Sequence, residues 1–585
     1  MRVLLLQPED SPEQGPWSRQ KWDLIVDLGK SSPFSEEKWS HQCRCPILRT
    51  DSFRHRIVDA RTVRQRFVPC LGRLIDEEGI DWWDLLALLV APDALTLLAL
   101  QGVAGELSSS AELWATRGGG IAGMLAVVLN RSIRDFGGSG LERSLARLGH
   151  TAGVARRFSA SQIKEIFLDK YDPGYRWRSR FADKRRGGRE PVILLPSAYE
   201  NVSRTAAAYA RLLPEQRFLL VAARQSAKKF SRPENVQVRD LAAYAVSDSP
   251  ATEIASLLER WAKLSDDLKG SSEWRILFQT GALDLFPEWI RDGLSVRNAW
   301  RGVLDRESIS GVLCGDDSNR YTRLPVLLAA RRKIPTVDFH HGALDGWYVF
   351  KELPSDLYLA KSEMERDYLL RVCGLPADRV VIGAASARAT NIGAGKDRRN
   401  QDRTSGIFFS EPYEVAGMRT REVYREVLPP LCRVARESGH GVVVKLHPFE
   451  SLAQRSAIIR EVLAPEDREL VSVIDGPITS ELMERAWFGL TVESTTVIDC
   501  LQNGVRCFLC SWLAHSPFDY VGQYARFGIG EVLQDSKQLL EIPARMAAPD
   551  NRPIMRLDPS ATVDSAKLKT WLSKSHEVPS VRSGS

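Results

Sequence analysis

The sequence predicts an α/β protein in which two Rossmann-like parallel-sheet domains face each other across a cleft, preceded by an extra N-terminal α/β region. From Pro191 onward, short apolar strand patterns alternate with helical patterns, the order that gives a parallel sheet with helices on both faces. A polar, strongly charged stretch over residues 385–405 interrupts this alternation, which then starts again. At 585 residues the chain also exceeds one ordinary hydrophobic core.

Five segments follow from these patterns. They are an N-terminal α/β region of unassigned role over residues 1–175, a Rossmann-like acceptor-side domain over 190–385, a linker over 386–405, a Rossmann-like donor domain over 406–575, and a frayed tail over 576–585.

Each domain is defined by its short apolar runs. The N-terminal region has predicted strands at Val3–Leu6 and Leu24–Val26 and a helical pattern over Trp83–Leu100. The acceptor-side domain has a predicted helix at Ser203–Leu213, and the donor domain has one at Thr420–Glu437. The predicted strands of these two domains are Val192–Leu195, Phe218–Ala222, Gly311–Cys314, Thr336–Phe339, Asp356–Ala360, Val380–Gly383, Gly406–Ser410, Gly441–Leu446, Val471–Ile474, Phe488–Val492 and Arg506–Cys510.

The composition is that of a globular protein, with 44% hydrophobic and 26% charged residues. A net charge of +6 suits anionic substrates or a membrane surface and is far from a nucleic-acid-binding signature. The nine cysteines form no framework, so we expect buried thiols in a reducing cytosol and no metal site. Asp84, Pro92 and Asp93 interrupt the most apolar stretch, which favours a buried helix over a membrane span. The expected location is the cytoplasm, including the inner face of the cytoplasmic membrane.

Two strand ends of the donor domain predict a phosphate site. The strand Val442–Leu446 ends in His447-Pro448, and the strand Phe488–Val492 ends in Glu493-Ser494-Thr495-Thr496, directly before a helical pattern. In an open parallel sheet, ligands bind beyond the carboxyl ends of the strands, near helix N-termini. Hydroxyls, backbone N–H groups and an imidazole there can hold phosphate and stabilise a departing nucleotide. Read alone, Ser494–Thr496 would be a helix cap and His447 a turn residue.

His447-Pro448 followed by Glu493–Thr496 resembles the "HP" and "S/T" motifs of bacterial GT-B transferases, over roughly residues 310–515. Those families include sialyltransferases, Kdo transferases of capsule synthesis and CDP-glycerol glycerophosphotransferases. The resemblance implies that His447, Pro448 and Ser494–Thr496 hold the phosphates of a CMP- or CDP-linked donor. Glu493 is a candidate ligand for a sugar hydroxyl of the nucleotide.

The same resemblance suggests the general base. Phe339-His340-His341-Gly342 looks like the strand-end "HG" element that carries the base in the glycerophosphate transferases, so the role falls on His341. An imidazole suits the task because its pKa lies near neutrality. Asp317 and Asp316, which follow the strand Gly311–Cys314, are the competing bases. An aspartate pair after a strand is otherwise a turn or helix cap.

Other candidates rest on position alone. Glu411 ends the first strand of the donor domain and could meet the donor or the base, or be a solvated loop residue. Tyr199 follows the strand Val192–Leu195 and could touch the acceptor. Arg176, Trp177 and Arg178 open a basic run with interfacial aromatics that fits an anionic membrane surface or a lipid-linked phosphate, or a solvated linker.

The expected function is that of an inverting glycosyltransferase or polyol-phosphate transferase in surface-polysaccharide synthesis. It would use a nucleotide-activated donor, a glycan or lipid-linked acceptor, and no cofactor or nucleic acid. One alternative is a UDP-N-acetylhexosamine 2-epimerase, which shares the double-Rossmann plan but normally needs several carboxylates in the cleft. A second alternative is a non-catalytic GT-B-like binding module.

Overall fold

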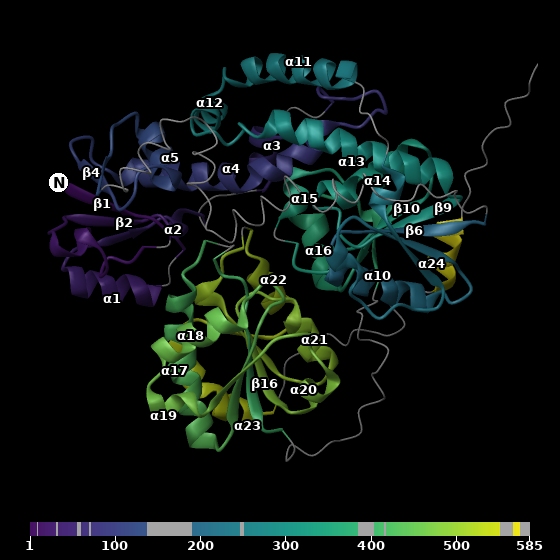
Figure 1. Cartoon of the computed structure of the whole chain (residues 1–585). Coiled ribbons are helices and arrows are strands. Elements are labelled where there is room, and N and C mark those ends of the chain that lie inside the picture. Colours follow the sequence, from purple (N-terminus) through teal and green to yellow (C-terminus); the bar gives the residue numbers. More distant parts are fainter. Residues whose placement is uncertain are drawn as a thin grey trace, which may run out of the picture.

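The computed structural model describes residues 1–8, 10–30, 33–54, 60–68, 72–136, 190–245, 251–344, 346–383, 403–414, 417–516, 518–549 and 565–573. Within these residues the chain forms three parallel β-sheets, each with its own helices (Figure 1). The α/β class is therefore confirmed. The second and third sheets are those of the two predicted Rossmann-like domains, for which acceptor-side and donor-side are kept as labels only, and the first sheet is the extra N-terminal unit.

The N-terminal sheet has the order β3-β2-β1-β4-β5. The strands at Val3–Leu6 and Leu24–Val26 are confirmed, and three further short strands were not predicted. The strands are β1 Arg2–Leu6, β2 Leu24–Asp27, β3 Ile47–Arg49, β4 Glu112–Ala115 and β5 Arg134–Asp135; the helices are α1 Pro33–Cys43, α2 Asp51–Arg54, α3 Ala60–Phe67, α4 Trp82–Glu106 and α5 Gly120–Leu129.

Helix α4 contains the most apolar stretch of the chain, the one interrupted by Asp84, Pro92 and Asp93. By length and composition its segment Ala87–Glu106 could cross a membrane, yet 56% of that window is buried inside the fold. Its buried residues belong to the largest hydrophobic core, which also includes residues of the second sheet. Helix α4 therefore joins the N-terminal unit to the acceptor-side unit.

The acceptor-side sheet has seven strands in the order β12-β11-β10-β9-β6-β7-β8. All six strands predicted for this domain are present, and β8 is additional. The strands are β6 Val192–Ser197, β7 Phe218–Ala222, β8 Val236–Asp240, β9 Ile309–Cys314, β10 Thr336–Asp338, β11 Leu357–Ala360 and β12 Val380–Ile382; the helices are α10 Glu200–Leu212, α11 Ala251–Leu268, α12 Ser272–Gln279, α13 Phe286–Arg306, α14 Arg320–Arg331, α15 Trp347–Phe350 and α16 Glu363–Arg371.

The donor-side sheet has six strands in the order β15-β14-β13-β16-β17-β18. All five predicted strands are present, and β18 is additional. The strands are β13 Ser405–Phe409, β14 Gly441–Lys445, β15 Val471–Ile474, β16 Ala486–Thr491, β17 Cys507–Cys510 and β18 Glu531–Leu533; the helices are α17 Thr420–Ser438, α18 Leu452–Val462, α19 Pro465–Arg468, α20 Ser480–Glu484, α21 Thr496–Gln502, α22 Tyr520–Arg526 and α23 Ile542–Ala547.

One domain boundary differs from the prediction. The last described helix, α24 Ser565–Ser573, packs on the acceptor-side sheet, where Leu568 and Leu572 join the core around β6 and β7. The segment 406–575 is therefore not one unit, because its final helix buries its apolar face on the other sheet. Most of the predicted linker, residues 386–402, and the tail 576–585 lie outside the described residues, and Ser405 already belongs to β13.

The N-terminal unit also contacts the donor side. The Arg419 guanidinium donates to both carboxylate oxygens of Asp27, at the end of β2, over 2.7 and 3.1 Å. It also donates to the backbone carbonyls of Gln7 and Asp10. The backbone N–H of Lys30 donates to the carbonyl of Gly417. The carboxyl edge of the N-terminal sheet is therefore built onto the donor-side unit.

Candidate functional site

The strand order of the acceptor-side sheet brings four loops together at one edge. Strands β10, β9, β6 and β7 are successive neighbours, and in a parallel sheet their carboxyl ends share one edge. The residues that follow them are His340 and His341 after β10, Asp316 after β9, Tyr199 after β6 and Arg224 after β7. The predicted acceptor-side residues Tyr199, Asp316 and His341 thus lie along one edge.

The His-Pro turn after β14 is held by a carboxylate that the sequence analysis missed. The backbone N–H of His447 donates to Oε2 of Glu450 over 2.8 Å. The other oxygen, Oε1, accepts from the Ser410 hydroxyl at 2.9 Å and from Nε of Arg455 at 2.6 Å. The spacing His-Pro-x-Glu was the available signal, because a side chain three residues on can close such a turn. Pro448 lies exposed within it.

The turn also determines which ring nitrogen of His447 carries the proton. The backbone N–H of Phe449 donates to Nδ1 of His447 over 3.2 Å, so Nδ1 is an acceptor. In the neutral ring the proton then sits on Nε2. Burial, followed by the neighbouring His341, lowers the pKa of His447 to about 4. At neutral pH the ring is an uncharged N–H donor, suited to a phosphate oxygen.

Replacing Glu450 with glutamine is expected to lower the free energy of unfolding by about 2 kcal/mol, because charge-assisted hydrogen bonds are lost while Arg455 keeps Glu414 as a partner. Urea unfolding measures the change. The control is Glu461→Gln, whose carboxylate pairs with arginines at the surface and should change stability little. Equal effects of the two substitutions would contradict the anchoring role of Glu450.

The hydroxyl cluster lies at the end of the neighbouring strand, β16. Ser494, Thr495 and Thr496 are half-buried, and Oγ of Ser494 accepts the backbone N–H of Thr496 at 3.3 Å. Helix α21 begins here but is short, and Thr495 provides no side-chain cap. The cluster is thus on the same sheet edge as His447, two strands away in the order β14-β13-β16.

Glu411 and Glu493 hold the shape of their loops, and their roles as donor ligands stay predictions. Oε1 of Glu411 accepts the Thr491 hydroxyl at 2.9 Å and three consecutive backbone N–H groups, those of residues 492–494. Glu493 is 3% exposed, and its oxygens accept the N–H groups of His515 and Ser516 and the Ser516 hydroxyl. Through these contacts with backbone N–H and hydroxyl groups, the two carboxylates hold the loop that carries Ser494.

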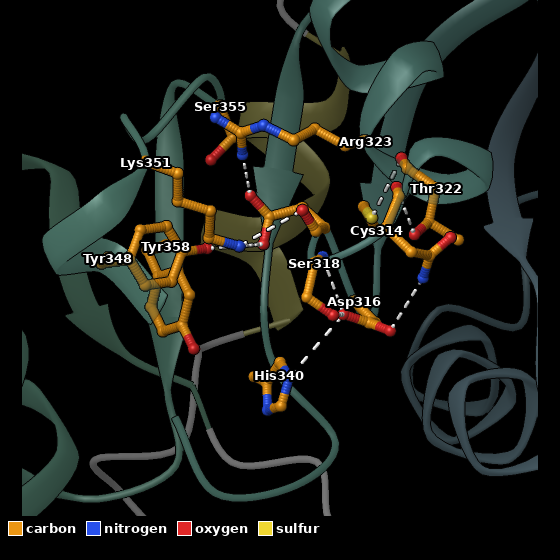
Figure 2. Close-up of polar contacts among 12 residues, drawn as sticks. Cys314, Asp316, Ser318, Thr322, Arg323, His340, Tyr348, Lys351, Ser355 and Tyr358 are labelled. Atoms are coloured by element: carbon orange, nitrogen blue, oxygen red, sulfur yellow. Dashed lines mark hydrogen bonds and ion pairs between the residues drawn. The ribbon is translucent and has the colours of Figure 1, made fainter. Parts of the chain in front are cut away.

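The predicted base lies beside an ordered imidazole and a carboxylate. His340 is buried, its Nδ1 accepts the backbone N–H of Gly342 at 3.1 Å, and its Nε2 lies 3.7 Å from Oδ1 of Asp316 (Figure 2). The rings of His340 and His341 are 4.9 Å apart. Burial lowers the pKa of His341, and Asp316 opposes that shift. The arrangement keeps His341 neutral, the form in which an imidazole accepts a proton.

Asp316 supports its loop. Its carboxylate accepts the backbone N–H and the hydroxyl of Ser318 and, at 3.2 Å, an N–H of the Asn319 side chain. With its side chain 4% exposed, it is placed to orient the His340 ring and the loop before α14, and its role as a base stays a prediction.

Asp317 is enclosed by cationic side chains, contrary to its prediction as a base. Its side chain is 1% exposed and is paired with Arg323 and Lys351, and it accepts the Tyr348 hydroxyl at 2.9 Å. Burial acts to raise the pKa of Asp317, but Lys351 and Arg323 outweigh it and hold the pKa below its ordinary value. Arg323 also pairs with Asp84 of α4. Asp317 is therefore the centre of a buried ion network that fastens α4 to β9.

The acceptor side and the donor side meet at aromatic residues. The rings of Tyr199 and Phe449 are 6.4 Å apart, and those of Phe449 and His447 are 4.9 Å apart. His341 is close enough to His447 to help lower its pKa. Imidazoles from two different sheets thus lie near one another where the two units meet. The predicted contacts Arg176, Trp177 and Arg178 lie outside the described residues.

Comparison with family models and with curated proteins finds no match to the sequence. Solved structures with a similar fold include CalG4, the calicheamicin glycosyltransferase, at 13% identity and a TM-score of 0.40, covering 66% of this chain and 100% of that one. The UDP-GlcNAc 2-epimerase from Methanocaldococcus jannaschii matches at 11% identity and a TM-score of 0.37, over 62% and 94% of the two chains. The enzyme from Neisseria meningitidis, bound to UDP-GlcNAc, matches at 12% and 0.37, over 61% and 91%. Such distant likenesses carry nothing about activity.

Proposed function

We propose that the protein is an inverting GT-B transferase that moves a sugar or polyol-phosphate group from a CMP- or CDP-linked donor to a surface-polysaccharide acceptor. The observation that supports it is that His341 and His447, which follow strands of two different sheets, are near enough for His341 to help lower the pKa of His447. The Tyr199–Phe449 contact gives independent support, since it joins the loop of His447 to the loop after β6, which lies on the same sheet edge as the loop of His341.

In this reaction the neutral His341 takes the proton of the acceptor hydroxyl, and the resulting oxygen attacks the donor from the side opposite the leaving phosphate. His447 donates its Nε2 proton as a hydrogen bond to that phosphate, and the hydroxyls of Ser494–Thr496 add further donors. Asp316 and His340 hold the loop that carries His341, and they take no part in the proton transfer itself.

A thermal-shift screen with CMP, CDP, UDP and GDP tests the donor assignment. A cytidine nucleotide should raise the melting temperature, and His447→Ala should weaken its binding by about tenfold or more, because a hydrogen bond to a charged phosphate is lost. The matched variant is His341→Ala, which should keep the nucleotide-induced shift and lose group transfer.

Three results would contradict the proposal. A shift by UDP alone, with C2 epimerisation of UDP-GlcNAc, would favour the isomerase. Nucleotide binding unaffected by His447→Ala would remove the phosphate role of that ring. Full cellular function of His341→Ala would favour a non-catalytic binding module.

A further inference from the structure

One carboxylate oxygen of the donor-side unit receives four hydrogen bonds. Oε1 of Glu411 accepts three consecutive backbone N–H groups, those of residues 492–494, over 3.1, 2.9 and 3.2 Å. It also accepts the Thr491 hydroxyl over 2.9 Å. We call these four donors, on residues 491–494, the anion nest. Successive backbone N–H groups that converge in this way form a concave site for a negatively charged oxygen, including the oxygens of a phosphate.

The anion nest lies on the sheet edge that carries the groups assigned to the donor phosphate. It begins at the end of β16 and runs directly into Ser494–Thr496. Glu411 follows β13, which lies between β16 and β14, the strand that leads to His447. Since neighbouring strands are about 4.8 Å apart, β16 and β14 are separated by about 10 Å. Glu411 therefore has the central position on this part of the edge.

The side chain of Glu411 lies on the outer side of the nest. Thr491, Val492 and Glu493 are at most 3% exposed, whereas Glu411 is half-buried. The carboxylate is thus the more accessible partner in the contact. Rotation about its own side-chain bonds would take it out of the nest and leave the four donors to another anion.

The charge of Glu411 is not held in place by a cationic side chain. In the same unit the carboxylates of Glu414 and Glu450 pair with Arg455. In the part of the chain that the structure describes, Glu411 forms no ion pair with an arginine or a lysine. Burial raises the pKa of Glu411 above its ordinary value, although His515 and the donors of the nest oppose that shift. The charged carboxylate is therefore less stable in the nest than it would be in water.

A phosphate is a stronger ligand for the same donors. It carries more negative charge than a carboxylate and presents three strong acceptor oxygens. Hydrogen bonds from backbone N–H groups to such an oxyanion are among the strong, charge-assisted ones. The nest therefore favours a phosphate over the carboxylate of Glu411.

We propose that Glu411 is a built-in competitor at the donor site: its carboxylate occupies the anion nest, and a phosphate group of the donor displaces it and takes over the same four donors. The inference rests on the proposed transferase function in taking this phosphate to be that of a nucleotide-activated donor. The exchange makes the site selective, because only an anion that binds the nest better than a carboxylate gains from it.

A permanent structural anchor is the competing explanation, because a carboxylate that binds three backbone N–H groups also fixes a loop. The two explanations predict opposite effects of removing Glu411. If the side chain only anchors the loop, its removal leaves the nest misshapen and weakens phosphate binding. If the side chain competes with phosphate, its removal strengthens phosphate binding, since the nest is then fully available.

Calorimetric titration of the full chain with inorganic pyrophosphate and with CDP tests the inference. Glu411→Ala should bind both probes about tenfold more tightly than the parent, because no carboxylate shares the nest. Glu411→Gln keeps an amide oxygen for the nest but removes the charge, so its gain should be smaller, about threefold. Unfolding curves check that each variant is folded, and Glu411→Gln decides the test if Glu411→Ala is not.

The control is Glu437→Ala, which removes the same charge from the exposed side of α17, where Glu437 pairs with Arg433. Salt screens a charge at this distance, so the affinity for either probe should change by less than about twofold. The inference is overturned if the folded variants of Glu411 bind pyrophosphate no more tightly than the parent, or if Glu437→Ala gives an equal gain.

The nucleotide screen on the same preparation separates the two proposals. Tighter pyrophosphate binding by Glu411→Ala, without any nucleotide-induced shift, would keep the exchange at the nest and remove the nucleotide donor. A nucleotide shift that depends on His447, but is unchanged or weakened in Glu411→Ala, would keep the transferase and remove the exchange.

Discussion

Replacing Asp317 with asparagine should destabilise the protein by about 3–5 kcal/mol, the usual effect of breaking a buried ion pair from one side. Asp317 is buried between Arg323 and Lys351, so the substitution leaves two cations without their shared partner. Burial, followed by Asp317, raises the pKa of neighbouring Asp338 well above its ordinary range, so in the parent protein Asp317 is the charged partner of the two cations. Equilibrium unfolding in urea measures the loss.

Asp367→Asn is the matched control. Asp367 pairs with Arg371 and Arg526 at the surface, where such pairs contribute about 0–1 kcal/mol. A folded Asp317→Asn protein of undiminished stability that had lost only its transfer activity would contradict the structural role and restore Asp317 as the base.

Lowering the pH below about 6.5, the ordinary pKa of histidine, should lower the free energy of unfolding, and His340 should account for a large share of that loss. Burial, followed by His341, lowers the pKa of His340 to about 3, so between these values the unfolded chain binds a proton that the folded chain excludes. That difference lowers the free energy of unfolding by about 1.4 kcal/mol per pH unit, or about 2 kcal/mol between pH 6.5 and 5. His447, which is half-buried, adds a smaller contribution of the same sign.

His340→Gln isolates this contribution, because other groups also titrate in acid. The variant should lose about 2 kcal/mol less than the parent between pH 6.5 and 5, as measured by urea unfolding at several pH values. The control is His41→Gln, since His41 is exposed on α1. Parallel pH profiles for His340→Gln and the parent would show that the ring is not held neutral by the fold.

The sequence was sufficient to predict most strands of the second and third sheets, because each central strand is a continuous apolar run followed by a helical pattern. It did not predict strands β3 and β5, because they are only three and two residues long and contain charged residues. The return of α24 to the acceptor-side sheet also has no local signal, since its apolar face fits either sheet.

The candidate site also contains residues that the sequence could place and residues whose roles it could not predict. His447 and Ser494 could be placed because a strand end is a local property of the chain. The roles of Asp317, Glu411 and Glu493 could not, because their partners come from elsewhere: Lys351 is 34 residues from Asp317, and Thr491 is 80 residues from Glu411. A carboxylate after a strand looks the same in sequence whether it meets a substrate or an internal cation.

The contact between Arg419 and Asp27 limits how the molecule can move. Both side chains are almost fully buried, and their ion pair links the N-terminal unit to the donor-side unit. The ion pair between Asp84 and Arg323 links the same N-terminal unit to the acceptor-side unit. Opening by a hinge between the lobes would pull a guanidinium from its carboxylate without water to replace it, which costs several kcal/mol. The N-terminal unit therefore acts as a brace between the two other units, and the angle between their sheets is set when the chain folds.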